Sequence, residues 1–192
     1  MILSDSQISA IPGLIEPFTD KLVRRFSIRP VISYGLSSFG YDLRLSREDF
    51  RIFRHIPGTV VDPKRFNPDN LEQAELHTDN GSEYFILPGH SYGLGVAMER
   101  LSMPGNVTGI CLGKSTYARS GGIVNMTPVE AGWVGYLTIE ISNSSHADMR
   151  VYAGEGICQI VFLQHDDGCE TTYEDRKGKY QGQKKEVTLP RI

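Results

Sequence analysis

The sequence has few cysteines, no long apolar run and no basic leader at its start. Its three cysteines, Cys111, Cys158 and Cys169, cannot all pair, and none forms a Cys-x-x-Cys motif. We therefore expect free thiols in a reducing compartment. No apolar run approaches the roughly 18 residues that a membrane helix needs, and the first residues lack the basic start and apolar core of a signal peptide. These absences predict a cytoplasmic protein without a membrane partner.

Motifs for metal-dependent and nucleophilic hydrolysis are also missing. Zinc deaminases need a His/Cys-x-Glu and a Pro-Cys-x-x-Cys motif, because the metal lowers the pKa of the attacking water. Neither motif occurs, the five histidines are scattered, and no Gly-x-Ser-x-Gly is present. His90 and His165 border predicted strands, so we expect them in turns. A base deaminase with this sequence would need a carboxylate to activate water, and partial burial would help by raising its pKa.

The net charge of the chain is small, but its charges are unevenly distributed. The formal net charge of −3 over 192 residues argues against a nucleic-acid-coating surface. Residues 176–192 carry six basic side chains and one acidic one, so this tail is +5 and the rest of the chain is −8. The tail is either simply solvated or a lid that folds over a small polyanion. The chain length and the 40% hydrophobic content fit one domain, residues 1–192, with residues 176–192 as its basic tail.

Glycine and proline interrupt the sequence too often for long helices. Ser4 and Asp5 are N-cap candidates for a short helix that stops by Pro12-Gly13. Residues 41–45 and 92–96 have strand character, and the polar segment 64–82 is expected to carry a helical turn around residues 71–76.

Two segments give clearer strand signals. In residues 135–142, Leu137, Ile139 and Ile141 alternate with polar residues that include Thr138 and Glu140, which is the period of a strand with one apolar face. Residues 157–163 are apolar on both faces except at Gln159, which predicts a central, buried strand. The fold class is therefore mostly β, a sandwich or distorted barrel with short peripheral helices.

The polar residues in these strands have two interpretations each. Glu140 is either a solvated strand residue or a functional carboxylate. Gln159 must find hydrogen-bond partners, so it is either a core glutamine satisfied by the backbone or a residue that reads a ligand.

Residues 113–119 form the segment that most clearly suggests a binding function. Lys114 and Arg119 flank hydroxyl side chains after Gly113, and such cations suit phosphate oxygens. A nucleotide-binding loop and a charged surface turn both fit these residue types. A P-loop is excluded, because Thr108 stands where its first glycine is required.

Several motifs, in order along nearly the whole chain, resemble those of the bacterial, zinc-independent dCTP deaminase family. They are Ile15-Glu16-Pro17-Phe18, Ser37-Ser38-Phe39-Gly40-Tyr41-Asp42-Leu43-Arg44, Val61-Asp62-Pro63-Lys64, Cys111-Leu112-Gly113-Lys114-Ser115-Thr116-Tyr117-Ala118-Arg119, Val124-Asn125-Met126-Thr127-Pro128-Val129-Glu130, Leu137-Thr138-Ile139-Glu140-Ile141-Ser142-Asn143, Gly178-Lys179-Tyr180-Gln181-Gly182-Gln183 and Val187-Thr188-Leu189-Pro190.

This resemblance implies a distorted β-barrel, or β-clip, shared with trimeric dUTP pyrophosphatases, and a homotrimer with active sites at subunit contacts. It also implies deamination of dCTP to dUTP and ammonia, which feeds dUMP and dTMP synthesis. No protein-bound metal is implied; Mg²⁺ travels with the triphosphate. Feedback inhibition by dTTP is a further expectation from the family.

The resemblance also implies roles for individual residues. Glu140 matches the catalytic glutamate that donates and accepts protons, and Ser115 and Arg119 match residues that hold the water and the ring. The residues implied to bind the nucleotide are Lys114, Ser115, Thr116, Tyr117, Ala118, Arg119, Thr138, Ile139, Glu140, Gln159, Tyr173, Lys179 and Gln183.

One region departs from some relatives. Those relatives have a longer loop with an Asp-Pro before the Gly-Trp pair, whereas Glu130 stands near that Asp here, which leaves its role open. Relatives that also cleave dUTP carry a Thr-Ala-Gly and an Asp in this region, so their absence favours a deaminase that releases dUTP. A bifunctional enzyme that yields dUMP and a non-catalytic nucleotide-binding domain are the alternatives.

Overall fold

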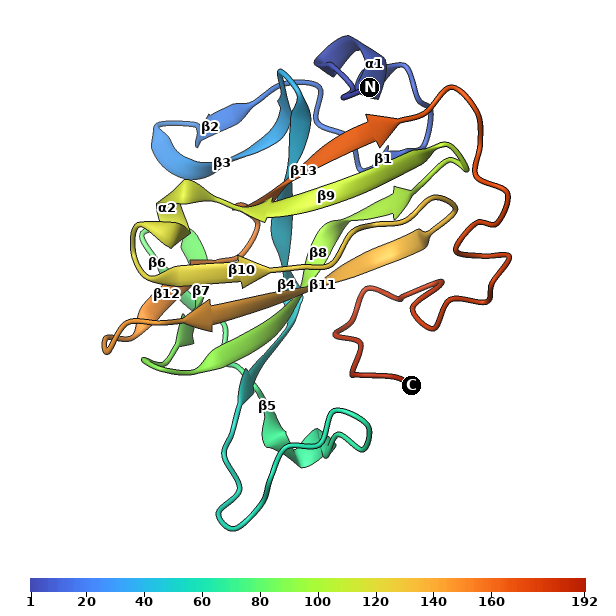
Figure 1. The fold of residues 1–192 in the computed structure, drawn as a ribbon. Helices are drawn as coiled ribbons and strands as arrows, with labels where there is room; N and C mark the ends of the chain where they lie inside the picture. Colours follow the sequence, from blue (N-terminus) through green and yellow to red (C-terminus); the bar gives the residue numbers. More distant parts are fainter.

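Short strands separated by tight turns build this protein, whose computed structural model describes residues 1–192 (Figure 1). No helix is long and apolar enough to span a bilayer. The elements, in chain order, are α1 (Asp5–Ser9), β1 (Ile15–Glu16), β2 (Val23–Phe26), β3 (Arg29–Ser37), β4 (Gly40–Phe53), the 3₁₀ turn η1 (Pro68–Asn70), β5 (Leu71–Gln73), β6 (His77–Asp79), β7 (Ser82–Leu87), β8 (Tyr92–Ser102), β9 (Val107–Gly113), α2 (Ser115–Ala118), β10 (Gly122–Asn125), β11 (Val134–Asn143), β12 (Met149–Tyr152) and β13 (Gly156–Gln164).

The strands form a large curled sheet and a small one. The large sheet runs β10-β11-β8-β4-β13-β9, with β1, β2, β3 and β5 attached at its sides, and β12-β7-β6 form the second sheet. The long strand β4 pairs with β13 through residues 41–44 and with β8 through residues 45–52, with a register shift between Leu45 and Phe50. Such irregularities bend a strand and increase its twist, so β4 carries the sheet around the core. The mostly-β barrel-like fold with short peripheral helices is confirmed.

The core fills the space inside this curl. Tyr41, Leu43 and Phe50 of β4 are fully buried, and Phe50 stacks on Phe85 of the small sheet at 4.8 Å between ring centroids. A Cβ at Gly95 of β8 would lie 2.5 Å from Leu45 Cδ1, so only glycine lets the strand approach so closely.

The two strands with the clearest sequence signals form as predicted, with one difference each. β11 includes residues 135–142, but a register shift between Tyr136 and Thr138 interrupts the strict alternation. β13 is central, lying between β4 and β9. Only one of its faces is buried, however: Val161 and Leu163 are half-buried, because no second layer covers the face that β13 shares with β9.

The expected helical turn at residues 71–76 is wrong. Leu71–Gln73 is strand β5, which pairs with β4, and the turn lies just before it at Pro68–Asn70. The free edge of β4 supplies backbone partners for β5, while Asn67 caps the turn by accepting a hydrogen bond from the Asp69 N–H. Other local predictions are confirmed: the short helix, which covers residues 5–9, the turn at His90, and three free cysteines. His165 lies directly after β13, just before a bend, and not in a turn.

After β13 the chain returns along β11 as a tail without helix or strand (Figure 1, red). Trp133 Nε1 donates to the Tyr180 carbonyl at 2.8 Å, and Tyr136 N donates to the Gln183 carbonyl at 3.0 Å. Val187 is buried, and its N–H donates to Asp49 Oδ2 at 2.8 Å. These bonds fix the tail against the β11 side of the sheet.

Candidate active site

A cavity of about 930 Å³ lies between the β11 side of the large sheet and the tail. Strand β11, the loop that precedes it, Phe66 of the segment after β4 and the tail all contribute to its walls. The lining residues are Phe66, Tyr92, Leu94, Thr127, Pro128, Val129, Glu130, Trp133, Leu137, Thr138, Glu140, Tyr173, Arg176, Lys177, Gly178, Lys179, Tyr180, Gln183, Thr188, Pro190 and Ile192.

Glu140 is the carboxyl group at the sheet side of this cavity. Its neighbours Ile139 and Ile141 point into the core, so strand alternation directs Glu140 to the opposite face. Burial raises the pKa of Glu140 to about 7, and a hydrogen bond from its own backbone N–H offsets only part of this effect. A carboxyl group with a pKa near neutrality can both accept and donate a proton at physiological pH.

Thr138 connects the strand to the tail inside the cavity. The Thr138 N–H donates to Gln183 Oε1 at 3.3 Å, and Thr138 Oγ1 accepts from the Thr188 N–H at 3.0 Å. Leu137, beside the register shift, lines the cavity and also packs against the edge of the core. Ile139 is fully buried, so its side chain does not reach the cavity.

The tail contributes the basic and aromatic wall. Tyr173 is held at both ends, because its N–H donates to the Ala131 carbonyl at 2.8 Å and its hydroxyl accepts from the Tyr180 N–H at 3.0 Å. Lys179 Nζ donates to the Arg191 carbonyl at 2.7 Å. The cavity thus unites five predicted site residues, and they are Thr138, Glu140, Tyr173, Lys179 and Gln183.

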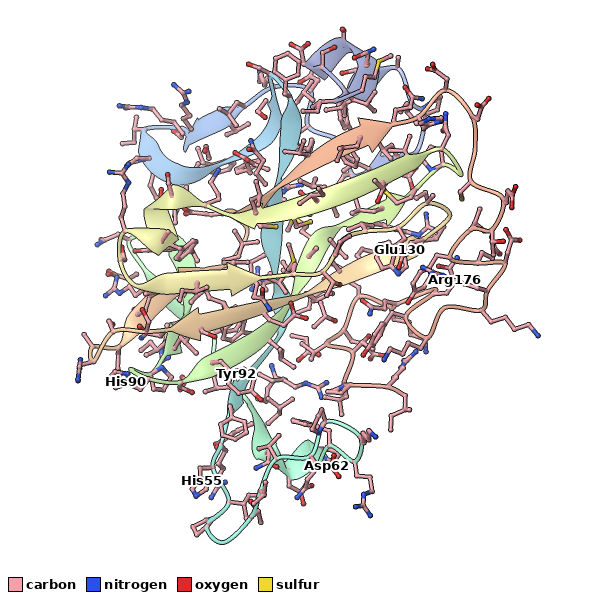
Figure 2. The ribbon with its side chains drawn as sticks, in the orientation of Figure 1. His55, Asp62, His90, Tyr92, Glu130 and Arg176 are labelled. Atoms are coloured by element: carbon pink, nitrogen blue, oxygen red, sulfur yellow. The ribbon has the colours of Figure 1, made fainter.

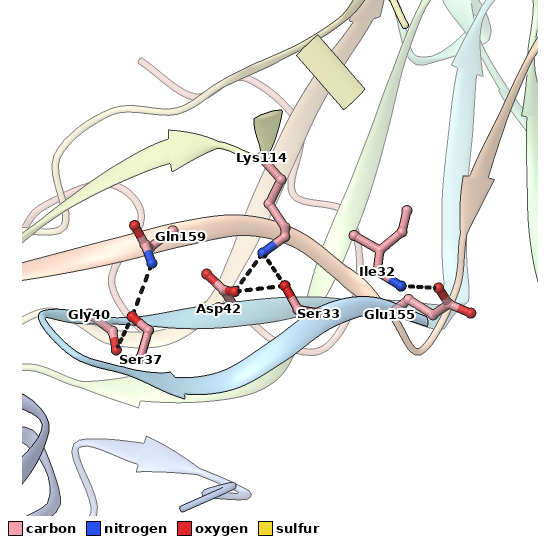
Figure 3. Close-up of polar contacts among 8 residues, drawn as sticks. All are labelled: Ile32, Ser33, Ser37, Gly40, Asp42, Lys114, Glu155 and Gln159. Carbon is pink, nitrogen blue, oxygen red and sulfur yellow. Dashed lines mark hydrogen bonds and ion pairs between the residues drawn. The ribbon is translucent and has the colours of Figure 1, made fainter. Parts of the chain in front are cut away.

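The remaining predicted residues lie elsewhere, around the turn at α2. Lys114 Nζ donates to Asp42 Oδ2 at 2.5 Å and to Ser33 Oγ at 3.0 Å, as Figure 3 shows. Both partners of this ion pair are largely buried, with side-chain exposures of 12% for Lys114 and 4% for Asp42. The Lys114 ammonium is therefore directed into the protein in this structure.

The other residues of the turn divide into buried and exposed ones. Tyr117 belongs to the core: its hydroxyl accepts from the Tyr152 N–H at 2.9 Å, and burial raises the pKa of this phenol well above its usual value. Ser115, Ala118 and Arg119 are exposed. Thr116 is also exposed and lines a second cavity of about 510 Å³.

Gln159 lies beside the Lys114 ion pair and not in the Glu140 cavity. Its Nε2 donates to Ser37 Oγ at 3.0 Å, and in the sheet it pairs with Asp42 (Figure 3). Gln159 is half-buried on the uncovered face of β13. Its partner is a side-chain hydroxyl rather than the backbone.

Sequence reasoning missed several residues of the Glu140 cavity and of the Lys114–Asp42 cluster. Arg176, Lys177 and Tyr92 line the Glu140 cavity, and the basic charge of the tail was the only sign of the first two. Glu130, whose role the sequence left open, lines the cavity and forms an ion pair with Arg176 (Figure 2). Asp42 was part of a quoted motif but was assigned no role, although it carries the ion pair of Lys114.

No group of three or more His, Cys, Asp and Glu side chains is arranged to hold a metal ion. The absence of a bound metal from the mechanism stays a prediction.

The architecture has a counterpart among solved structures. The crystal structure of 2'-deoxycytidine 5'-triphosphate deaminase from Agrobacterium tumefaciens is similar with a TM-score of 0.58 at 20% identity, over 85% of this chain and 48% of that chain. At this identity the likeness defines the fold, which is that of a dCTP deaminase.

Sequence comparisons identify the family. A family model described as dCTP deaminase-like matches residues 6–165. The dCTP deaminase of Dechloromonas aromatica is 47% identical over 97% of this chain and 95% of its own length, and that of Campylobacter jejuni is 50% identical over 93% and 90%. The chain belongs to the dCTP deaminase-like family.

Proposed function

We propose that this protein is a dCTP deaminase, which hydrolyses dCTP to dUTP and ammonia and so supplies dUMP and dTMP synthesis in the cytoplasm. The observation that carries the proposal is Glu140, a carboxyl group with a pKa raised to about 7 in a cavity whose other wall is basic. The names of the relatives, which cover nearly the whole chain, agree with this substrate.

In the proposed reaction Glu140 moves protons at the cytosine ring. Its carboxylate accepts a proton from a water molecule, and the water oxygen bonds to the ring carbon that carries the amino group. Glu140 passes this first proton to the ring nitrogen beside that carbon. It then carries the remaining hydroxyl proton to the amino group, the carbon–nitrogen bond breaks, and ammonia leaves with a carbonyl in its place. One water is consumed and one ammonia released, and Glu140 regains its starting state.

The tail suits the triphosphate. Lys179 and its neighbours place positive charge opposite Glu140, and Tyr173 and Gln183 lie on the same wall. A wall of this kind binds phosphate oxygens and excludes water from the reacting end, which strengthens electrostatic interactions there. Mg²⁺ arrives with the substrate and needs no ligand set of its own.

We further propose that the active site is completed by a second subunit of a homotrimer. Ser115 and Arg119 are exposed and lie outside the Glu140 cavity, so one chain does not present all predicted catalytic residues together. Strand β9, which leads into α2, also exposes apolar side chains: Ile110 and Leu112 are 43% and 55% exposed. Exposed apolar patches on a sheet face are typical of subunit contacts.

The products test this proposal. Incubation with dCTP and Mg²⁺ is expected to release ammonia and dUTP in equal amounts, measured enzymatically and by anion-exchange chromatography. dUMP with pyrophosphate would indicate the bifunctional reaction instead. Binding of dCTP without any turnover would support a non-catalytic nucleotide-binding protein. Addition of dTTP to the same assay tests the predicted feedback inhibition.

A further inference from the structure

Arg176 is the one cation of the cavity wall that forms an ion pair. Its Nη2 contacts Glu130 Oε2 across the gap between the tail and the loop before β11, and Figure 2 shows the two side chains pointing toward each other. Lys177, which lines the same wall, forms no ion pair, and Lys179 donates to the Arg191 carbonyl and lies over the Tyr180 ring. Arg176 and Glu130 are each about half exposed, with 48% and 45% of their side chains accessible.

Local structure holds Arg176 in this position. Its N–H donates to the Thr172 carbonyl at 3.2 Å, and Thr172 Oγ1 donates to Asp175 Oδ2 at 2.7 Å, which closes a tight turn just before Arg176. The guanidinium lies over the Tyr173 ring at 5.2 Å from its centroid. A guanidinium that stacks on an aromatic ring and faces a cavity is held in place to bind the oxygens of a carboxylate or a phosphate.

The ion pair is not needed to hold the tail in place. Trp133 Nε1 and the Val134 N–H bind the tail at Tyr180 and Gln181, and Gln181 Nε2 donates to the Gly132 carbonyl at 3.0 Å. These bonds involve the buried or half-buried backbone around β11. Exposed ion pairs add little to stability by comparison, so the position of Arg176 in the cavity requires another explanation.

We propose that Arg176 binds the part of the triphosphate beyond the first phosphate, which dCMP lacks, and that Glu130 is its partner until a nucleotide arrives. This inference rests on the proposed function and names one group that recognises the triphosphate. Charge-assisted bonds from a guanidinium to phosphate oxygens are strong and often bidentate. A triphosphate also carries more negative charge than the single carboxylate that it replaces. Entry of the phosphates therefore moves Arg176 from Glu130 to the ligand, with no covalent change.

The test measures nucleotide binding by calorimetry in proteins that all carry Glu140→Gln, so that turnover does not consume the dCTP. The probes are dCTP and dCMP with Mg²⁺. We expect Arg176→Gln to weaken dCTP binding about 10- to 100-fold, the usual effect of losing a hydrogen bond to a charged group, and to change dCMP binding less than about 3-fold. Glu130→Gln removes only the competing partner, so dCTP binding stays equal or becomes tighter.

Arg150→Gln is the matched control. Arg150 is also about half exposed and paired, with its Nη1 2.8 Å from Asp79 Oδ2, but it lies on β12, outside the residues that line the cavity. Its replacement is expected to leave the binding of both nucleotides unchanged.

Two results would overturn the inference. One is an equal effect of Arg176→Gln on dCTP and dCMP, including no effect on either. The other is a loss of dCTP binding in Glu130→Gln as large as in Arg176→Gln. That result would mean that the ion pair only holds the tail in position and that Arg176 does not bind the phosphates. Because binding is measured apart from turnover, a protein that binds dCTP through Arg176 but releases no ammonia would refute the proposed function and not this inference.

Discussion

Glu140 and Asp42 are both acidic residues on strands of the large sheet, but they lie in opposite surroundings. Asp42 is paired with the Lys114 ammonium and Ser33 in a largely buried cluster, whereas burial without a cationic partner raises the pKa of Glu140 to about 7. A carboxylate with a fixed partner holds elements together. A carboxyl group without one, beside a cavity, is available for proton transfer.

Similar acidic residues therefore serve two purposes in this chain, one structural and one chemical. The Asp42 cluster ties the turn at α2 to β3 and β4, and thereby sets where the exposed Ser115 and Arg119 lie. In contrast, the polar side chains of Glu140 and Thr138 line a cavity in which a ligand can bind.

Replacement of Glu140 has the largest expected effect. Glu140→Gln keeps the shape of the side chain but cannot move a proton, so kcat for ammonia release from dCTP falls by about 10³-fold, within the usual range for a general acid–base group. Nucleotide binding, followed by calorimetry, persists. Glu72→Gln on the exposed strand β5 is the control and retains wild-type turnover. Unchanged turnover in Glu140→Gln would remove this residue from the mechanism.

Replacement of Asp42 acts on stability. Asp42→Asn leaves the Lys114 charge buried without a counter-charge, and we expect the free energy of unfolding to fall by about 3 kcal/mol, measured with urea. The double variant Asp42→Asn/Lys114→Met recovers part of this loss, because no buried charge is left unpaired. For the exposed Arg176–Glu130 pair we expect a smaller effect, because Glu130→Gln lowers the free energy of unfolding by about 1 kcal/mol or less. Equal losses at the two sites would contradict the structural role of Asp42.

The pH dependence has the smallest expected effect. Since Glu140 has a folded-state pKa of about 7, raised from 4.5, its burial favours the protonated form. The stability of the unliganded protein is therefore greatest below pH 4.5 as far as this group is concerned, and it declines as the pH rises from about 4.5 to 7. The shift corresponds to at most about 3 kcal/mol, which solvent screening of the partly exposed side chain reduces to roughly 2 kcal/mol. Over the same range kcat/KM rises, because the carboxylate is the form that accepts a proton from water. A stability profile identical in Glu140→Gln would contradict this assignment.

Much of the fold could be predicted from local patterns. The alternation of Ile139 and Ile141 with Glu140 placed this carboxyl group on the polar face of a strand, and the structure agrees. The turn at residues 71–76 could not be predicted correctly, because the free edge of β4 that pairs with Leu71–Gln73 is distant in sequence. The uncovered face of β13 was missed for a similar reason: apolar residues on both faces do not reveal whether a second layer is present.

The site was predictable only in part. Family motifs gave Tyr173, Lys179 and Gln183, and the structure brings them to Glu140 by folding the tail back along β11. The same motifs do not show that Lys114 is directed inward to Asp42, because that ion pair depends on the spacing between β3, β4 and the turn at α2. Nor does any motif identify Arg176, whose partner Glu130 lies 46 positions earlier in the sequence.

The central claim, that Glu140 of one subunit works with Arg119 of another, is tested most directly by mixing two inactive variants. Arg119→Ala and Glu140→Gln chains, co-expressed with different affinity tags and purified through both, are each expected to be inactive alone. In mixed trimers one of the three subunit contacts supplies both intact residues, so ammonia release returns to about a third of the wild-type rate. No recovery in verified mixed trimers would contradict a shared site and place the whole reaction within one chain.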